Sequence, residues 1–188
     1  MTAPDPTAIL ARCYDELGRL LAGLADEQLS LPTPNPGWDV RTLLNHVGGG
    51  LAMFTVASRG DVVTHDDPDD VLGRDPAATL TVLMRENLDA WRRPGALHTT
   101  CHLPLGSMPG ADAALLNAVE IAAHNWDLAR SIDAATGIDE EVAQRLLTFA
   151  GTLPLDELRA AGELGPEVGL PADATCADRL LALTGRRP

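Results

Sequence analysis

Apolar residues recur at intervals of three and four along several segments of the chain, the spacing that lines one face of an α-helix. In the first segment, from Pro6 to about Ala25, leucines dominate this face. Proline and glycine interrupt the pattern between segments, as in Ser30 to Gly37 (SLPTPNPG), where three prolines force an extended crossover. An aspartate near the start of several segments can cap a helix with its carboxylate. We therefore predict helices over residues 6–25, 39–60, 75–93, 112–132 and 139–149, and a short one at 177–183.

The composition agrees with an all-α fold. A length of 188 residues suits one domain, spanning residues 1–188. Hydrophobic residues make up 45% of the chain and aromatic residues only 3%, so leucine, alanine and valine must fill the core, which favours helices. Short alternating stretches in ALHTTCHLPLGSMPG (residues 96–110) predict a small hairpin or lid before the fourth helix. The tail beyond Gly151 is rich in proline and glycine, and we expect it to wrap over the helices.

The net charge bears on which partners the protein can bind, and the cysteines bear on whether it has disulfides or a cysteine metal site. A net charge of −13 disfavours nucleic acid and anionic membranes, because both attract clustered cations. The sequence shows neither a secretory leader nor an apolar run long enough for a bilayer, so we expect a soluble, cytoplasmic protein. Cys13, Cys101 and Cys176 lie far apart and form no CxxC pair, which predicts mostly buried, reduced thiols rather than disulfides or a cysteine zinc site.

The segment NAVEIAAHNWD, from Asn117 to Asp127, carries the residues best suited to chemistry. On a helix, Asn117, Glu120, His124 and Asp127 share one narrow strip within an otherwise apolar surface. A Glu and a His one turn apart often form only a surface pair that supports the helix. In this apolar setting an unpaired carboxylate is costly, and a bound divalent metal would remove that cost. Glu120 and His124 are therefore candidate ligands for two of the three protein positions of an open metal site.

A third ligand must come from another helix. His46 lies at the edge of the apolar stripe in the second predicted helix, where a histidine is commonly a satisfied core residue rather than a ligand. The run Gly48 to Gly50 weakens that helix and suggests close approach of another helix or of a ligand. A second cluster of His98, Cys101 and His102 is conceivable, but an exposed or half-packed loop is the favoured interpretation of that segment.

Two blocks of sequence resemble the DinB-like superfamily, which includes the N-terminal domains of mycothiol-dependent maleylpyruvate isomerases. They are PGWDVRTLLNHVGGG, from Pro36 to Gly50, and EIAAHNWDLARSIDAATG, from Glu120 to Gly137. The resemblance covers most of the chain. Within the superfamily, the chain is similar to a short subfamily of presumed metal-binding proteins. It implies a four-helix bundle that holds a divalent ion, usually taken to be zinc. Carried over residue by residue, it implies the ligands His46, Glu120 and His124.

The same resemblance frames three functional hypotheses. In the first, the metal activates a small thiol, with mycothiol as the candidate, for attack on an electrophilic substrate, as in a transferase or isomerase. In the second, a metal-dependent hydrolase uses Asp127 as the base for a water molecule. In the third, the metal only stabilises a helical binding protein. Asp127 and Asn117 could orient a ligand or the water, although Asp127 could also serve packing alone.

The metal ion, the reaction and the oligomeric state each have more than one candidate. Two histidines and one carboxylate also suit Fe²⁺ and Ni²⁺, although we expect zinc. The isomerases of the superfamily carry an additional C-terminal domain that contributes to their active site, and this sequence ends before one. We therefore expect the metal site, but not the isomerase reaction, to carry over. Either a monomer or a homodimer is compatible with such a bundle.

Overall fold

The computed structural model describes residues 5–63, 70–162 and 164–188, and it divides the chain into two compact units, Met1–Thr136 and Gly137–Pro188. Both units are built mainly from helices, as the sequence predicts. That the two units form one domain stays a prediction.

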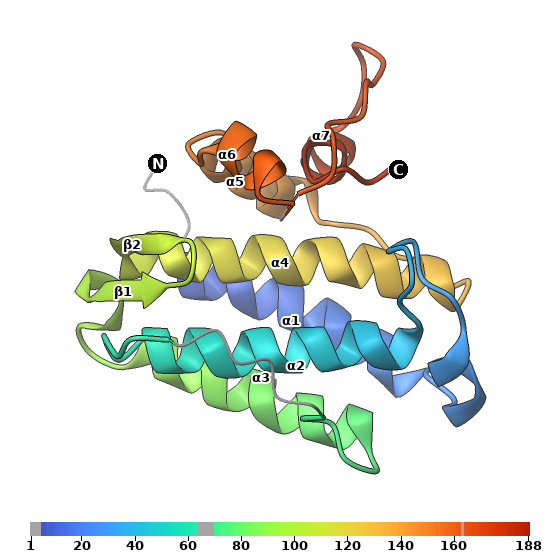
Figure 1. Ribbon diagram of the computed structural model, residues 1–188, viewed down its shortest axis with the longest axis horizontal. Helices are drawn as coiled ribbons and strands as arrows, with labels where there is room; N and C mark the ends of the chain where they lie inside the picture. Colours follow the sequence, from blue (N-terminus) through green and yellow to red (C-terminus); the bar gives the residue numbers. More distant parts are fainter. Residues whose placement is uncertain (1–4, 64–69, 163) are drawn as a thin grey trace. The chain divides into compact units, whose positions relative to one another are not determined.

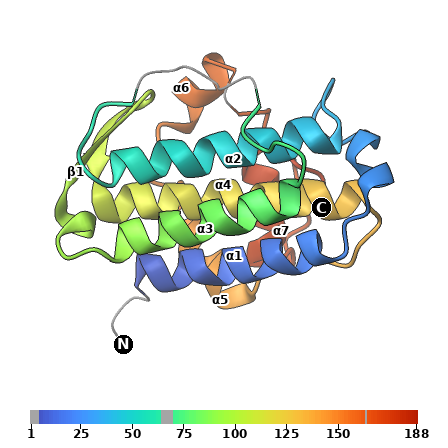
Figure 2. The same ribbon diagram turned by 90° about the horizontal axis from the view of Figure 1, so that it is seen from below.

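Among the described residues, the first unit is built on four long helices (Figure 1). They are α1 (Pro6–Ala22), α2 (Val40–Ala57), α3 (Pro76–Arg92) and α4 (Gly110–Ser131). Helix α1 packs against α3 and α4, and α2 packs against the same two helices, so each has two neighbours in a ring (Figure 2). The predicted four-helix bundle is therefore confirmed.

Aspartates cap three of these helices, as the sequence predicts for Asp39 and Asp75. The side chain of Asp5 accepts a hydrogen bond from the backbone N–H of α1, and Asp39 and Asp75 do the same for α2 and α3. Each bond satisfies a donor that has no partner within the first turn of its helix. Helix α1 ends at Ala22, three residues before the predicted end, because Gly23 caps it.

The interior of the bundle combines an apolar core with a small polar network. Leucines from all four helices are buried, together with the rings of Phe54 and Trp91. The hydroxyl of Tyr14, on α1, donates to Oδ1 of Asn87 on α3 at 2.8 Å. Nδ2 of Asn87 in turn donates to the carbonyl of Leu51 on α2 at 2.9 Å. This network satisfies the fully buried side-chain amide of Asn87 and links α1, α2 and α3 by hydrogen bonds.

Two of the connections between the helices of the first unit contain a 3₁₀ turn. A 3₁₀ turn, η1 (Asp26–Ser30), and the proline-rich segment follow α1, and a second 3₁₀ turn, η2 (Ala96–His98), follows α3. The predicted hairpin is confirmed: β1 (Thr100–Leu103) pairs antiparallel with β2 (Gly106–Pro109), with Cys101 opposite Met108. Helix α4 follows β2 directly and begins two residues before the predicted start.

The second unit contains α5 (Glu140–Ala150), α6 (Leu155–Ala160) and α7 (Cys176–Leu183), of which α5 packs against α7. Helices α5 and α7 confirm the prediction, whereas α6 was not predicted. The sequence LDELRA has good helix formers, but six residues are too few to show a periodic pattern. That the tail wraps over the bundle stays a prediction. Among the helices of the described residues, none has both the length and the apolar character that crossing a bilayer requires.

Candidate metal centre

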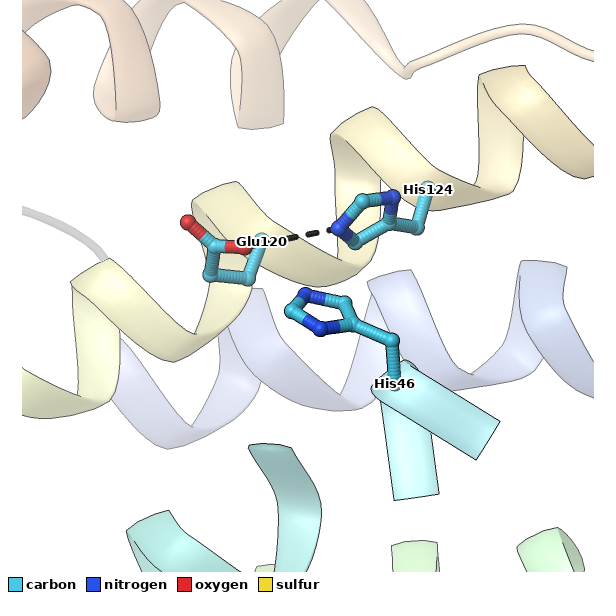
Figure 3. A group of neighbouring side chains, drawn as sticks. All are labelled: His46, Glu120 and His124. Carbon is cyan, nitrogen blue, oxygen red and sulfur yellow. Dashed lines mark ion pairs between the residues drawn. The ribbon is translucent and has the colours of Figure 1, made fainter. Parts of the chain in front are cut away.

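His46, Glu120 and His124 converge between α2 and α4 (Figure 3). Each offers one ligand atom, and these atoms lie within 4.8 Å of one another. Nε2 of His124 is 3.5 Å from Oε2 of Glu120, as expected for side chains one turn apart on the same helix face. The structure therefore brings together the three residues that the sequence proposes as ligands, and they could hold a metal ion.

The exposure of these side chains corrects two points of the sequence interpretation. His46 is exposed, so the alternative of a satisfied core histidine does not apply. The side chain of Glu120 is 44% exposed, so water can solvate its carboxylate without a metal. The cost of burying a carboxylate falls instead on Asp127, whose side chain is fully buried and is paired with His124. The cluster is thus open on the side of His46 and Glu120 and closed behind His124.

Asp127 contacts the ring of His124 on the side opposite Glu120. Nδ1 of His124 lies 3.0 Å from Oδ2 of Asp127, whereas Nε2 faces Glu120. An ionised carboxylate can only accept, so an ionised Asp127 pairs with the tautomer of His124 that carries its proton on Nδ1. The lone pair of Nε2 is then available to a metal, which is the usual arrangement for a metal-binding histidine with a carboxylate behind it.

Two residues of the connection between α1 and α2, Asn35 and Trp38, reach this centre, and the sequence analysis assigned neither to it. Nδ2 of Asn35 donates to Oδ2 of Asp127 at 3.0 Å. The ring of Trp38 lies 4.9 Å from that of His46 and 6.4 Å from that of His124, measured between centroids. No local pattern in a proline-rich connection indicates where its side chains point, so the sequence offered no signal for either contact.

Asn117 lies one turn before Glu120 but makes its contacts in the core. Its Oδ1 accepts a hydrogen bond from Nε1 of Trp91 at 3.3 Å and lies 3.5 Å from the hydroxyl of Tyr14, whose shorter bond is to Asn87. The residue is 1% exposed. These contacts give Asn117 a structural function in the polar network of the bundle, and a catalytic function for it stays a prediction.

The segment with His98, Cys101 and His102 has a different arrangement. Cys101 is buried, while Nδ1 of His102 makes a hydrogen bond with Oγ of Ser107 across the hairpin at 2.8 Å. In residues 5–63, 70–162 and 164–188, the group close enough to share an ion is His46, Glu120 and His124. The interpretation of residues 96–110 as a structural loop is therefore favoured.

The three cysteines all have raised pKa values. Burial raises the pKa of Cys13 to about 12, and burial also raises the pKa of Cys101. The pKa of Cys176 is raised, first by a hydrogen bond to Glu140 and then by burial. The thiols of this chain therefore stay protonated at neutral pH.

We expect alkylation by iodoacetamide at neutral pH to be slow for all three cysteines in the folded protein, because the thiolate is the reactive form. Mass spectrometry of timed samples measures the modified fraction at each cysteine, with urea-unfolded protein as the reference. Cys13 should react last, and its rate should still be rising at the highest pH at which the fold survives. Rapid modification of any of the three in the folded state would contradict the assignment of protonated thiols.

The chain is similar to known proteins in sequence and in fold. The chain is 30% identical over 183 residues to the uncharacterized proteins Rv0738 and MT0763 of two Mycobacterium tuberculosis strains, covering 97% of this chain and 98% of each relative. Its fold is similar to the crystal structure of the mycothiol-dependent maleylpyruvate isomerase, with a TM-score of 0.60 and 16% identity. That match covers 80% of this chain and 70% of the isomerase. A crystal structure of a histidine-to-alanine mutant of the isomerase matches with a TM-score of 0.57 and 13% identity.

The family model of the mycothiol maleylpyruvate isomerase N-terminal domain matches residues 10–129, a range that includes α2, the cluster of His46, Glu120 and His124, and Asp127. This chain is therefore a member of the mycothiol maleylpyruvate isomerase N-terminal domain family.

Proposed function

We propose that the protein is a zinc-dependent enzyme that transfers a low-molecular-weight thiol, mycothiol or one of the same class, to a small electrophile. The observation that carries the proposal is the cluster of His46, Glu120 and His124, in which His46 is exposed and Glu120 half-buried. The membership of the family supports the choice of thiol, since a structurally similar protein is a mycothiol-dependent isomerase.

The residues present fit a divalent ion. Zinc binds histidine nitrogen and carboxylate oxygen at about 2.0–2.2 Å, so two ligands of one ion lie roughly 3.4 Å apart in a tetrahedral site. The 3.5 Å between His124 and Glu120 agrees with this spacing. His46 is exposed, its ring lies beside that of His124, and its ligand atom is within 4.8 Å of those of Glu120 and His124, so it can supply the third ligand. The same donors accept Ni²⁺ or Fe²⁺, and elemental analysis distinguishes these ions from zinc.

Each residue has a distinct function in this proposal. When bound, the ion would lower the pKa of a coordinated thiol or water toward neutrality. His46 and His124 would bind it as neutral imidazoles, and Glu120 would contribute one negative charge, so the centre keeps a net charge near +1. Asp127 would hold His124 in the required tautomer. Trp38 would cover one side of the two imidazoles and limit access of water there.

The position of Asp127 favours thiol activation over hydrolysis. A hydrolase needs a base that can reach the attacking water, and Asp127 was the candidate. Its carboxylate is fully buried and bonds Nδ1 of His124, the ring nitrogen that faces away from Glu120. In addition, the raised pKa values of the three cysteines mean that a thiolate must come from an external thiol. The exposure of His46 and Glu120 argues against a closed, purely structural metal site.

Cobalt-substituted protein provides a test that needs no knowledge of the electrophile. We expect mycothiol to produce a thiol-to-cobalt charge-transfer band in the near ultraviolet that saturates at one thiol per metal. The glycosyl scaffold of mycothiol without its cysteine should produce no band, and neither should thiol added to cobalt-treated His124→Ala protein. A cobalt-loaded protein whose spectrum does not change with thiol would overturn the thiol-transfer proposal and direct attention to hydrolysis.

A further inference from the structure

The proline-rich connection between α1 and α2 ends in a tight turn, Asn35–Trp38, with the sequence NPGW. The backbone N–H of Trp38 donates to the carbonyl of Asn35 at 3.1 Å, and Gly37 has a φ of 83°. Proline at the second position and a left-handed glycine at the third are the features of a type II β-turn. The direction of Asn35 is therefore set by a turn that the sequence itself specifies.

A second set of hydrogen bonds closes the loop around this turn. The backbone N–H of Thr33 donates to the carbonyl of Trp38 at 3.0 Å, and the hydroxyl of Thr33 donates to the same carbonyl at 3.0 Å. At the base, the N–H of Val40 donates to the carbonyl of Leu31. Because prolines also fix several backbone angles, little conformational entropy remains for the loop to lose when its tip makes a contact.

Both ends of the turn contact the candidate metal centre. The ring of Trp38 lies beside His46 and His124, while the amide of Asn35 reaches Asp127. The amide of Asn35 and the imidazole of His124 bind the same oxygen of Asp127, Oδ2, each at 3.0 Å. A carboxylate oxygen with two donors in fixed directions has little freedom to rotate, and Asp127 is fully buried.

We propose that Asn35 is a positioning residue of the metal centre, which acts through Asp127 to hold Nε2 of His124 in the direction of the ion. The proposal rests on the function proposed above, because it requires His124 to bind a metal. Without the amide of Asn35, Oδ2 of Asp127 loses one of the two donors that fix its direction, and the ring of His124 is held less firmly. The metal affinity then falls although every ligand is present.

Two substitutions of Asn35 separate this function from simple space filling. Asn35→Ala removes the donor, and we expect it to raise the Kd for Zn²⁺ about threefold to tenfold, below the roughly 10–100-fold effect of losing a direct partner of a ligand. Asn35→Asp keeps the size of the side chain but places a second carboxylate beside Asp127, so we expect a larger loss. If Asn35 only filled space, the Asp variant would be close to wild type and the Ala variant weaker.

The measurement is the Kd for Zn²⁺ alone, by competition with a chromophoric chelator, combined with thermal melting of the metal-free proteins to verify folding. Gln28→Ala is the matched control, because it removes an amide side chain from the same connection, where Oε1 of Gln28 accepts a hydrogen bond from the backbone N–H of Ala25. We expect wild-type affinity for this control. In an Asp127→Ala background, Asn35→Ala should change the Kd less than twofold, since the path between Asn35 and His124 is already broken.

The outcomes distinguish the two proposals. Tight zinc binding by the wild type with an unchanged Kd in Asn35→Ala, or an Asp variant tighter than the Ala variant, would overturn the function of Asn35 and leave the metal centre intact. An undiminished effect of Asn35→Ala in the Asp127→Ala background would also overturn it. A wild type that binds no zinc would overturn the proposed function and the function of Asn35 together.

Discussion

Replacing His124 with alanine is expected to reduce the zinc content of the protein from about one ion per chain to nearly none. His124 occupies the middle of the centre, since its ring contacts Glu120 through Nε2, Asp127 through Nδ1 and the ring of His46 at a centroid distance of 5.0 Å. Its removal deletes one ligand and leaves the buried carboxylate of Asp127 without one of its donors. We expect losses of similar size for His46→Ala and Glu120→Ala, because an incomplete ligand set fails as a unit.

Elemental analysis after dialysis against a weak chelator measures this loss, and the double variants should add little to the single ones. His98→Ala is the matched control, because His98 is an exposed histidine outside the cluster. It should retain the metal content of the wild type. If the His46→Ala protein kept the full zinc content of the wild type, His46 on α2 would not be a ligand. The ion would then be bound by residues of α4 without it.

The largest effect on folding is expected from Gly110→Ala, at the first residue of α4. A methyl group at this position would overlap the backbone carbonyl of Ala96 and approach the backbone of Leu97 within 3.1 Å. Both obstacles are main chain, so no side chain can rotate away, and the N–H of Gly110 is also held by the carbonyl of Thr99 at 2.7 Å. We expect a loss of about 3 kcal/mol in the free energy of unfolding, at the upper end for overpacking.

Urea unfolding followed by circular dichroism measures this loss, with Gly18→Ala as the matched control. Gly18 lies within α1, and a Cβ there would meet no atom within 4 Å. The control should gain roughly 0.5–1 kcal/mol, because alanine loses less entropy than glycine in a helix. A Gly110→Ala protein as stable as the wild type would show that the junction of η2 and α4 is looser than described.

Helices with long apolar stripes were predictable because the signal repeats within each segment. Helix α3, for example, begins at the cap Asp75 and ends just before Pro94, and both residues act through the local backbone. Helix α6 was missed because a helix of six residues contains less than two turns of pattern. The hairpin was predictable from its alternation, but its exact junction with α4 was not, because the close packing of Gly110 on Ala96 depends on tertiary structure.

The candidate centre shows the same division between local and tertiary information. Glu120 and His124 could be paired from their spacing on one helix, and the resemblance to a family added His46. The helical strip also placed Asn117 with these residues, but an angular position does not determine a contact, and Asn117 turns into the core toward Trp91. Asn35 could not be assigned, since its contact with Asp127 joins residues far apart in the sequence.

Anomalous diffraction at the zinc absorption edge, from crystals of the zinc-loaded protein, tests the existence of the metal centre most directly. The account predicts one peak between α2 and α4, about 2.0–2.2 Å from a ring nitrogen of His46, from Nε2 of His124 and from a carboxylate oxygen of Glu120. It also predicts that Asp127 contacts Nδ1 of His124 and not the ion. A peak elsewhere, such as at His98 and His102, or no peak from protein soaked in excess zinc, would contradict it.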